Sequence, residues 1–151
     1  MCIPMKNKHK QDTESNFKEL CQSGRGMKVV IKKSQFIASA YKISKVEEKK
    51  EILEKIKKEM KKASHHAWAL RCETPMGIWE DSSDDGEVSG CAGKPIMTIL
   101  QQLQIINVLV VVTRYYGGIN LGPAGLIKAY SSTAKQLVEN IGFETEKNIS
   151  K

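Results

Sequence analysis

A glycine-rich segment follows the most apolar run of the chain and carries the residues best suited to holding a ligand. The run Val108–Thr113 ends in Arg114, two tyrosines and then four glycines within nine residues. Glycines allow positive φ and close backbone approach, and the N–H groups that begin a following helix favour an anion. Arg114 would add a bidentate contact to phosphate or carboxylate. The candidate binding residues here are Arg114, Tyr115, Tyr116, Gly117, Gly118, Gly122 and Gly125.

This glycine loop matches neither of the common nucleotide-binding fingerprints. It lacks the Gly-Lys-Ser/Thr of a P-loop and the glycine spacing of a dinucleotide-binding turn. The two tyrosines point to opposite faces of a strand, so we expect one ring in the core and one free to stack on a base or a partner. Two interpretations stay open: an anion-binding loop, or a tight strand-to-helix turn in which Arg114 pairs with an acid of the chain.

Three carboxylates surround one glycine in the segment Asp84–Glu87. Such a group can bind a hard cation, act as general acid and base, or neutralise Arg114 and Lys94. The spacing of an EF-hand is absent, so a calcium site is not predicted. The simpler interpretation is an acidic turn that forms ion pairs with the basic half of the chain.

His65 completes a hypothetical catalytic set. With Asp84 and Glu87 it would serve a small hydrolase whose anionic substrate is held by the glycine loop, provided that the three side chains converge in the fold. His66 points the other way along a strand, so the two histidines cannot bind one metal together. Cys91, just ahead of a helix, is either a nucleophilic thiol or a small residue that fills a tight turn.

Charge is unevenly distributed along the chain. Lys and Arg number 24 against 17 Asp and Glu, which gives a formal net charge of +7. A predicted helix over residues 44–62 mixes both signs, as solvated helical faces do. From residue 88 to residue 138 there is no Asp or Glu, and the cations that remain are Lys94, Arg114, Lys128 and Lys135. This acid-free stretch predicts a basic surface, formed by Arg114, Lys94 and Lys128, for an anionic partner.

Cysteine usage and hydropathy bear on the compartment. No apolar run approaches the ~18 to 20 residues of a bilayer-spanning helix, and the first residues lack the apolar region of a signal peptide. We therefore expect a cytoplasmic protein without a membrane partner. The four cysteines, Cys2, Cys21, Cys72 and Cys91, share no CxxC spacing, which favours reduced thiols over disulfides or a zinc site. No metal and no cofactor are predicted.

Apolar periodicity predicts eight elements between two tails. They are strands at 27–32, 35–43, 65–73 and 107–114, a short strand at 78–79, and helices at 44–62, from Pro95 onward and at 124–140. Ser44 and Glu47 would form the capping box of the first helix. The order β-β-α-β-(β)-α-β-α predicts an α+β fold: a sheet with helices on one face and the strand at 107–114 in its middle. Residues 1–26 and 142–151 are predicted to be flexible tails around one domain, 27–141.

Many of these residues share their spacing with a known family. The pattern comprises Ser34-Gln35-Phe36-Ile37-Ala38, His65 with Trp68-Ala69, Asp84-Asp85-Gly86-Glu87, Gly93 with Ile96-Met97, and Arg114-Tyr115-Tyr116-Gly117-Gly118 with Leu121-Gly122. Over residues 27–140 the chain resembles the IMPACT family, which includes bacterial YigZ-like proteins. Many bacterial members have Thr where this chain has Cys91, which argues against a general catalytic role for that thiol.

The resemblance implies an α+β domain like domain 2 of ribosomal protein S5 and a role in translation or the stress response. Eukaryotic relatives damp the starvation response by competing for the scaffold that activates a translation-initiation-factor kinase. They carry an additional N-terminal RWD domain, and bacterial relatives carry a C-terminal ferredoxin-like domain. Because the two predicted tails are only about 25 and 10 residues long, we expect a single-domain member.

Three functional hypotheses remain. The first, which the acid-free half and the resemblance favour, is a non-enzymatic regulator that binds a protein or RNA of the translation machinery, such as the ribosome or the kinase-activating scaffold. DNA is not an expected partner. The second is the hydrolase that uses His65, Asp84 and Glu87. In the third, the shared residues only stabilise a difficult turn, and Arg114→Ala would then change stability alone.

Overall fold

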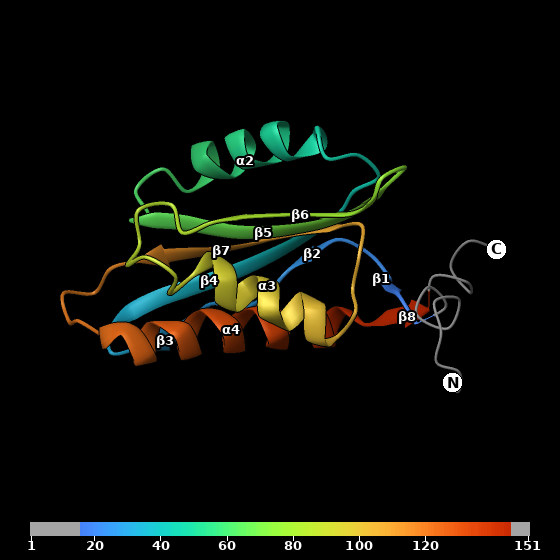
Figure 1. Cartoon of the computed structure of the whole chain (residues 1–151). Coiled ribbons are helices and arrows are strands. Elements are labelled where there is room, and N and C mark those ends of the chain that lie inside the picture. Colours follow the sequence, from blue (N-terminus) through green and yellow to red (C-terminus); the bar gives the residue numbers. More distant parts are fainter. Residues whose placement is uncertain (1–15, 146–151) are drawn as a thin grey trace.

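An antiparallel sheet lies between two layers of helix in the computed structural model, which describes residues 16–145 (Figure 1). Three helices and eight strands follow one another along this part of the chain. They are β1 (Lys18–Leu20), β2 (Gly24–Arg25), β3 (Val29–Ile31), β4 (Ser34–Lys42), α2 (Glu48–Glu59), β5 (His65–Thr74), β6 (Gly77–Ser83), α3 (Gly93–Gln102), β7 (Val108–Tyr115), α4 (Gly122–Ile141) and β8 (Phe143–Thr145). The predicted α+β class is confirmed.

Strand β7 occupies the middle of the six-stranded sheet, as its uninterrupted apolar run predicts. The strand order is β2-β4-β7-β5-β6, and β3 also pairs with β4. Every pair in this sheet is antiparallel, including the predicted pair of β3 and β4. In the register of β7, Arg114 lies opposite Phe36 on one side and His65 on the other. The first residues of β4 and β5 therefore meet the last residues of β7.

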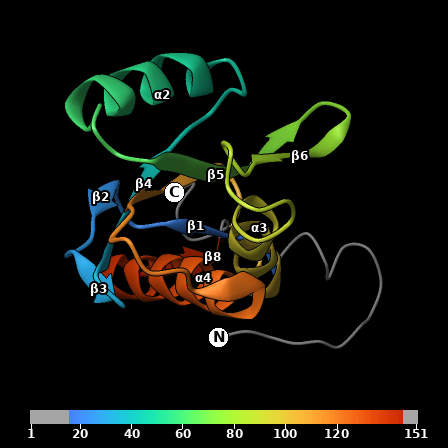
Figure 2. The same ribbon diagram turned by 90° about the vertical axis from the view of Figure 1, so that its left-hand side faces the viewer.

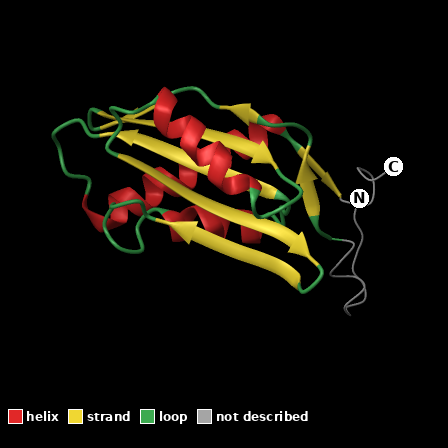
Figure 3. Cartoon of the chain, turned by 90° about the horizontal axis from the view of Figure 1, so that it is seen from above, coloured by secondary structure: helices red, strands yellow, loops and turns green. Residues whose placement is uncertain are grey.

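The two faces of the sheet have separate cores, each under its own helices. On one face Ala67 and Ala69 of β5 pack beneath α3 and α4, whereas on the other Trp68 and Leu70 pack beneath α2. Figures 1 and 3 show α2 alone on its side of the sheet. The prediction that all helices lie on one face is wrong. Small residues on one face leave room for α3 and α4 to approach closely, while Ile56 of α2 fills the other core.

The predicted tail boundaries also differ from the structure. Strands β1 and β2 form within the segment predicted to be a tail, and Leu20 of β1 is fully buried. β1 pairs antiparallel with β8, which places Leu20 opposite Phe143. The predicted tails at 16–26 and 142–145 are therefore part of the fold. Strands this short show no apolar periodicity, so the sequence gives no local signal for them. The rest of both predicted tails lies outside the described residues.

Two local predictions need correction. β6 extends to Ser83, so Glu80 and Asp81 lie within the strand, beyond the end of the short strand predicted at 78–79. Their carboxylates are paired with cations of neighbouring elements, Glu80 with Arg71 of β5 at 2.8 Å and Asp81 with Lys49 of α2 at 3.1 Å.

The carboxylate that caps the segment before α2 belongs to a residue one position later than predicted. The carboxylate of Glu48, not Glu47, accepts the N–H groups of Ser44 and Lys45, at 2.9 and 3.0 Å, together with the Ser44 hydroxyl. These hydrogen bonds, led by that of the Ser44 N–H, lower the pKa of Glu48. In residues 16–145 no helix has the length and hydropathy needed to cross a lipid bilayer.

Candidate functional site

The sequence-predicted site residues gather at one end of the sheet, which faces the viewer in Figure 2. Four connections meet there: the β3–β4 turn, the start of β5, the loop after β6 and the glycine loop 117–121 between β7 and α4. Strand register explains the meeting, since β4 and β5 both begin where β7 ends. We call this region the loop end of the molecule.

A buried ion pair forms the centre of the loop end. Arg114 Nη1 donates to both carboxylate oxygens of Glu87, at 3.0 and 2.9 Å, and the two residues are 4% and 9% exposed. The hydroxyl of Tyr130, on α4, donates to Glu87 Oε2. Burial, reinforced by the Glu87 carboxylate, raises the pKa of Tyr130, so its hydroxyl remains a donor. The interpretation of Arg114 as a surface cation is wrong, and its pairing with an acid of the chain is confirmed.

The other nitrogens of the Arg114 guanidinium also have protein partners. Nε and Nη2 lie 3.3 and 3.2 Å from the hydroxyl oxygen of Ser34, which also accepts the N–H of Gly117 at 3.1 Å. The guanidinium carbon also lies over the rings of Phe36 and Tyr116, 5.7 and 5.2 Å from their centroids. Arg114 thus ties β4, β7, the acidic turn and the glycine loop together.

His65 and Glu87 converge, as the hydrolase hypothesis requires. His65 Nδ1 donates to the carbonyl oxygen of Asp85 at 2.9 Å, because that oxygen can only accept. His65 Nε2 lies 3.5 Å from Glu87 Oε1, an ion pair when the imidazole carries both protons. Glu87 is already bonded to Arg114 and Tyr130, so its carboxylate is held by structural partners.

Asp84, the third candidate, is engaged elsewhere. Its carboxylate accepts the N–H groups of Gly90, Ala92 and Gly93 at 2.8 to 3.2 Å, which closes the loop before α3. Burial alone would raise the pKa of Asp84, but these three hydrogen bonds, aided by the nearby Lys94 ammonium, lower it overall. Asp84 therefore stabilises the start of α3, and the structure brings together only two of the three predicted catalytic residues.

Two further reactive side chains lie in the interior. His66 Nδ1 is 3.0 Å from the Thr113 hydroxyl, and burial lowers the pKa of His66. Cys91 is 4% exposed in the turn before α3. Within residues 16–145, no three His, Cys, Asp or Glu side chains are arranged to hold a metal ion.

The glycine loop combines a close backbone approach with an exposed surface. A Cβ atom on Gly117 would lie 2.1 Å from the carbonyl oxygen of Lys33, so only glycine fits against the β3–β4 turn. Gly118 and Gly122 adopt φ of +89° and +77°. The predicted division of the tyrosines is confirmed: Tyr115 packs partly against the core under α2, whereas Tyr116 is 49% exposed.

Exposed lysines lie on the turn beneath this loop and on helices α3 and α4, and two of them, Lys32 and Lys33, are not among the predicted site residues. Lys32 and Lys33 form the exposed turn beneath Gly117. Once Gln35 is aligned with Tyr115, the strand register alone places Lys33 opposite Gly117, and this is the signal that would have found it. Lys94 at the start of α3 and Lys128 on α4 are exposed, as predicted. Lys32, Lys33, Lys94, Lys128, Tyr116 and the glycine loop together are called the basic loop-end surface.

Comparison with known proteins places this geometry in context. Residues 32–138 match the model of the Impact N-terminal domain. The chain is 41% identical over 115 residues to an IMPACT family member of Haemophilus influenzae, covering 76% of this chain and 56% of that one. It spans about half the length of this and similar relatives.

Two solved structures resemble the fold. A hypothetical protein at 33% identity superimposes with a TM-score of 0.78 and covers 85% of this chain and 64% of its own. The two-domain translational regulator Yih1, at 26% identity, gives a TM-score of 0.55 and covers 93% of this chain and 55% of its own. The similarity therefore spans nearly all of the described residues.

Proposed function

Because this chain belongs to the IMPACT family, we propose that it is a non-enzymatic regulator of translation. It binds a component of the translation machinery through the basic loop-end surface. Yih1, to which it is similar, is described as a translational regulator. Within this proposal the domain is of the ribosomal protein S5 domain 2 type, acts in the cytoplasm, and contributes to a stress response. The chain spans only about half of its relatives, so the activity of those longer proteins is part of the proposal.

One observation carries the non-enzymatic assignment. The carboxylates at the loop end are hydrogen-bonded to other groups of the protein. Glu87 is bonded to Arg114 and Tyr130, and Asp84 is bonded to the backbone before α3. Arg114 and Tyr130 are buried, and Asp84 accepts three backbone N–H groups, so both carboxylates already have protein partners and neither is left free to act on a substrate. The cluster therefore supports a rigid framework that presents a binding surface.

The charge of the surrounding surface supports an anionic or acidic partner. Helices α3 and α4 carry no Asp or Glu before Glu139, so Lys94 and Lys128 are not neutralised by neighbours on their own helices. The opposite helix, α2, mixes Glu and Lys on its exposed face. A negatively charged partner would thus approach the loop end and the α3–α4 side in preference to α2.

A binding experiment tests this function. The tagged full chain is incubated with a cell lysate at low and high salt, and recovered ribosomal RNA and proteins are quantified. We expect recovery of ribosomal or translation-factor components by the wild type and at least about tenfold less with Lys33→Glu/Lys128→Glu. If RNA is the partner, recovery falls steeply with salt.

The control is Lys58→Glu, which reverses one charge on the exposed face of α2. It should bind as the wild type does. Equal loss with Lys58→Glu would mean that net charge alone governs recovery, and full recovery with the double variant would exclude the basic loop-end surface. Arg114→Ala is unsuitable as a test variant, since Arg114 is buried in the framework.

The hydrolase hypothesis keeps one supporting observation, the 3.5 Å approach of His65 Nε2 to Glu87 Oε1. The His65 side chain is partly exposed, and its Nε2 atom makes no hydrogen bond shorter than this 3.5 Å approach. Asp84 and Glu87, in contrast, are both hydrogen-bonded to structural partners. His65→Ala should leave recovery in the lysate experiment unchanged. A loss of recovery without a loss of folding would instead assign His65 a direct role.

A further inference from the structure

Strand β6 ends the sheet, and its outer edge has no partner strand among residues 16–145. The strand runs over seven residues, Gly77–Ser83, and pairs only with β5. It contains no proline. An edge of this length presents a row of backbone groups that can pair with another chain.

The side-chain hydrogen bond of Ser82 shows which backbone groups point outward. Its N–H is bonded to Asp81 Oδ1 at 2.9 Å rather than to the opposite strand. In an antiparallel ladder, opposed residues alternate between bonded and non-bonded pairs, so residues two and four positions away share the orientation of Ser82. Glu80 and Ile78 therefore also direct their N–H and C=O groups to the free edge.

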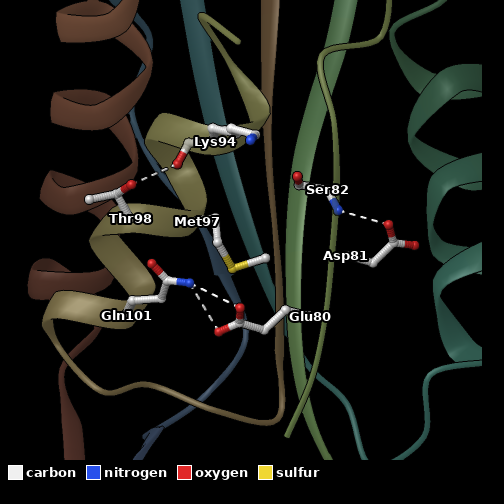
Figure 4. A pocket seen from close by; sticks show the side chains of 7 residues that line it. All are labelled: Glu80, Asp81, Ser82, Lys94, Met97, Thr98 and Gln101. Carbon is white, nitrogen blue, oxygen red and sulfur yellow. Dashed lines mark hydrogen bonds between the residues drawn. The ribbon is translucent and has the colours of Figure 1, made fainter.

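A groove of about 440 Å³ lies directly beside this edge, between β6 and α3. Figure 4 shows that Glu80 points across it to Gln101, whereas Asp81 points away from α3. Lys94 and Thr98 of α3 complete the polar side of the groove. The space is sufficient for the side chains of a strand laid next to β6, which would lie about 4.8 Å away.

The unpaired charge of the groove is positive. Glu80 is bonded to Arg71 and Gln101, and Asp81 is paired with Lys49. For Lys94, in contrast, the described residues provide no ion pair. A segment placed in the groove therefore meets one ammonium group near its Ser82 end that forms no ion pair, although it lies near enough to the Asp84 carboxylate to help lower the pKa of that group.

The other face of the same edge offers an apolar contact. Trp79 is 53% exposed and lies opposite Cys72, whose side chain belongs to the core under α2. Successive residues of a strand alternate between faces. A paired segment would thus present one set of side chains to Lys94 and the next to the Trp79 ring.

We propose that β6 and its groove bind an extended segment of a partner protein by strand addition, with an acidic side chain opposite Lys94 and an apolar one over Trp79. This surface shares Lys94 with the basic loop-end surface but goes beyond the proposed function, because strand pairing along β6 does not involve Lys33, Lys128 or the glycine loop. Backbone pairing supplies affinity in this mode, and the side chains on alternate positions supply selectivity.

Synthetic peptides provide the test. Three ten-residue peptides of alternating Val and Thr carry a central Glu, Gln or Lys, and each is titrated into the isotope-labelled full chain while amide exchange is followed by NMR. We expect the Glu peptide to bind at least about tenfold more tightly than the Lys peptide. We also expect it to slow exchange at Ile78 and Glu80 and to leave the amides of α2 unchanged.

Variants of the edge give the decisive comparison. Ser82→Pro places a ring on the outward side of the strand and should lower the affinity for the Glu peptide at least tenfold, whereas Ser82→Ala should bind within about twofold of the wild type. Lys94→Glu should reverse the preference between the Glu and Lys peptides. Spectra of the unbound variants verify that each is folded, and Lys94→Glu tests the groove even if Ser82→Pro does not fold.

Four outcomes would overturn the proposal. The first two are equal affinity for the Glu and Lys peptides and unchanged amide exchange at β6 when peptide is added. The third is a slowing of exchange at β6 that increases with protein concentration in the absence of peptide, which would make a second copy the occupant. The fourth is perturbation of β6 by an oligouridine but not by peptide. Ser82→Pro leaves Lys33 and Lys128 intact, so failure here is separable from failure of the lysate experiment.

Discussion

At the scale of single residues, Glu87 decides how the loop end is held together. Its carboxylate is the common acceptor for Arg114 and Tyr130 and approaches His65. A lone Arg before a glycine loop favours the idea that Arg114 binds an anion. The anion exists, but it is a side chain of the same protein. Glu87 lies 27 residues before Arg114, and only the fold brings the two together.

Replacing Glu87 should therefore destabilise the protein strongly. Glu87→Gln leaves the buried Arg114 charge without its counter-ion, which costs about 3 to 5 kcal/mol of unfolding free energy. Urea denaturation followed by circular dichroism measures this loss. The exposed Glu139→Gln serves as control and should change the free energy by less than about 0.5 kcal/mol. A loss below about 1 kcal/mol in Glu87→Gln would mean that the ion pair contributes little.

Asp84 contributes to the unfolding free energy in a way that depends on pH, and the direction of this dependence follows from its pKa. Its pKa is lowered in the folded state relative to the ordinary value of 3.8, so its stabilisation is complete above that pH and is lost as the pH falls through the folded-state value. Asp84→Ala should cost about 1 kcal/mol at neutral pH, as removal of a helix cap does. Unfolding free energies of both proteins from pH 7 to pH 2 should converge at the acid end. A constant difference across the range would refute the assignment.

At the scale of elements, the glycine loop is shaped by two different constraints. Gly117 is required because the β3–β4 turn occupies the space of its side chain, whereas Gly118 is required because its φ is +89° and no atom lies near its Cβ position. The first constraint is steric and depends on the neighbouring turn. The second is a property of the backbone alone.

These constraints predict unequal costs. Gly117→Ala must move the backbone near Lys33 and should lower the unfolding free energy by more than 2 kcal/mol, in the upper part of the about 1 to 3 kcal/mol range of overpacking. Gly118→Ala should cost only about 1 kcal/mol, the price of a left-handed residue. Chemical denaturation of the two variants side by side checks the order. Equal losses would indicate that the β3–β4 turn yields easily.

Element-level prediction from the sequence succeeded where apolar patterns are long. The strands β4, β5 and β7 and all three helices were located because each spans at least eight residues and carries a continuous or periodic apolar pattern. The full length of β6 was missed because Glu80 and Asp81 look like loop residues, and their cationic partners Arg71 and Lys49 are identified only by the fold. Lys33 was missed for a similar reason, since its position depends on pairing between β4 and β7.

At the scale of the whole molecule, the sheet has two covered faces. The alternation Ala67, Trp68, Ala69, Leu70 in β5 contained this information, because apolar residues occupy both of its faces. The element order alone gave no such indication. A strand with one solvated face would carry polar residues at every second position.

The extent of the folded domain can be tested at Leu20. Leu20→Ala should lower the unfolding free energy by about 2 to 5 kcal/mol, because this fully buried side chain belongs to the main core. Thermal and urea unfolding provide the measurement, with Gln22→Ala, an exposed neighbour, as the control. If the two variants are equally stable, β1 does not contribute to the cooperative fold.

The pairing of β1 with β8 has a further consequence for how this domain can be joined to others. Lys18 lies opposite Thr145, so the chain enters and leaves the described fold at adjacent positions. Figures 1 and 3 show this pair at the end of the molecule away from the glycine loop. A fold whose entry and exit are neighbours can be inserted as a module into a surface loop of a host protein, or circularly permuted, with little distortion. Such a fusion would keep the loop end facing outward, at the opposite end from the junction.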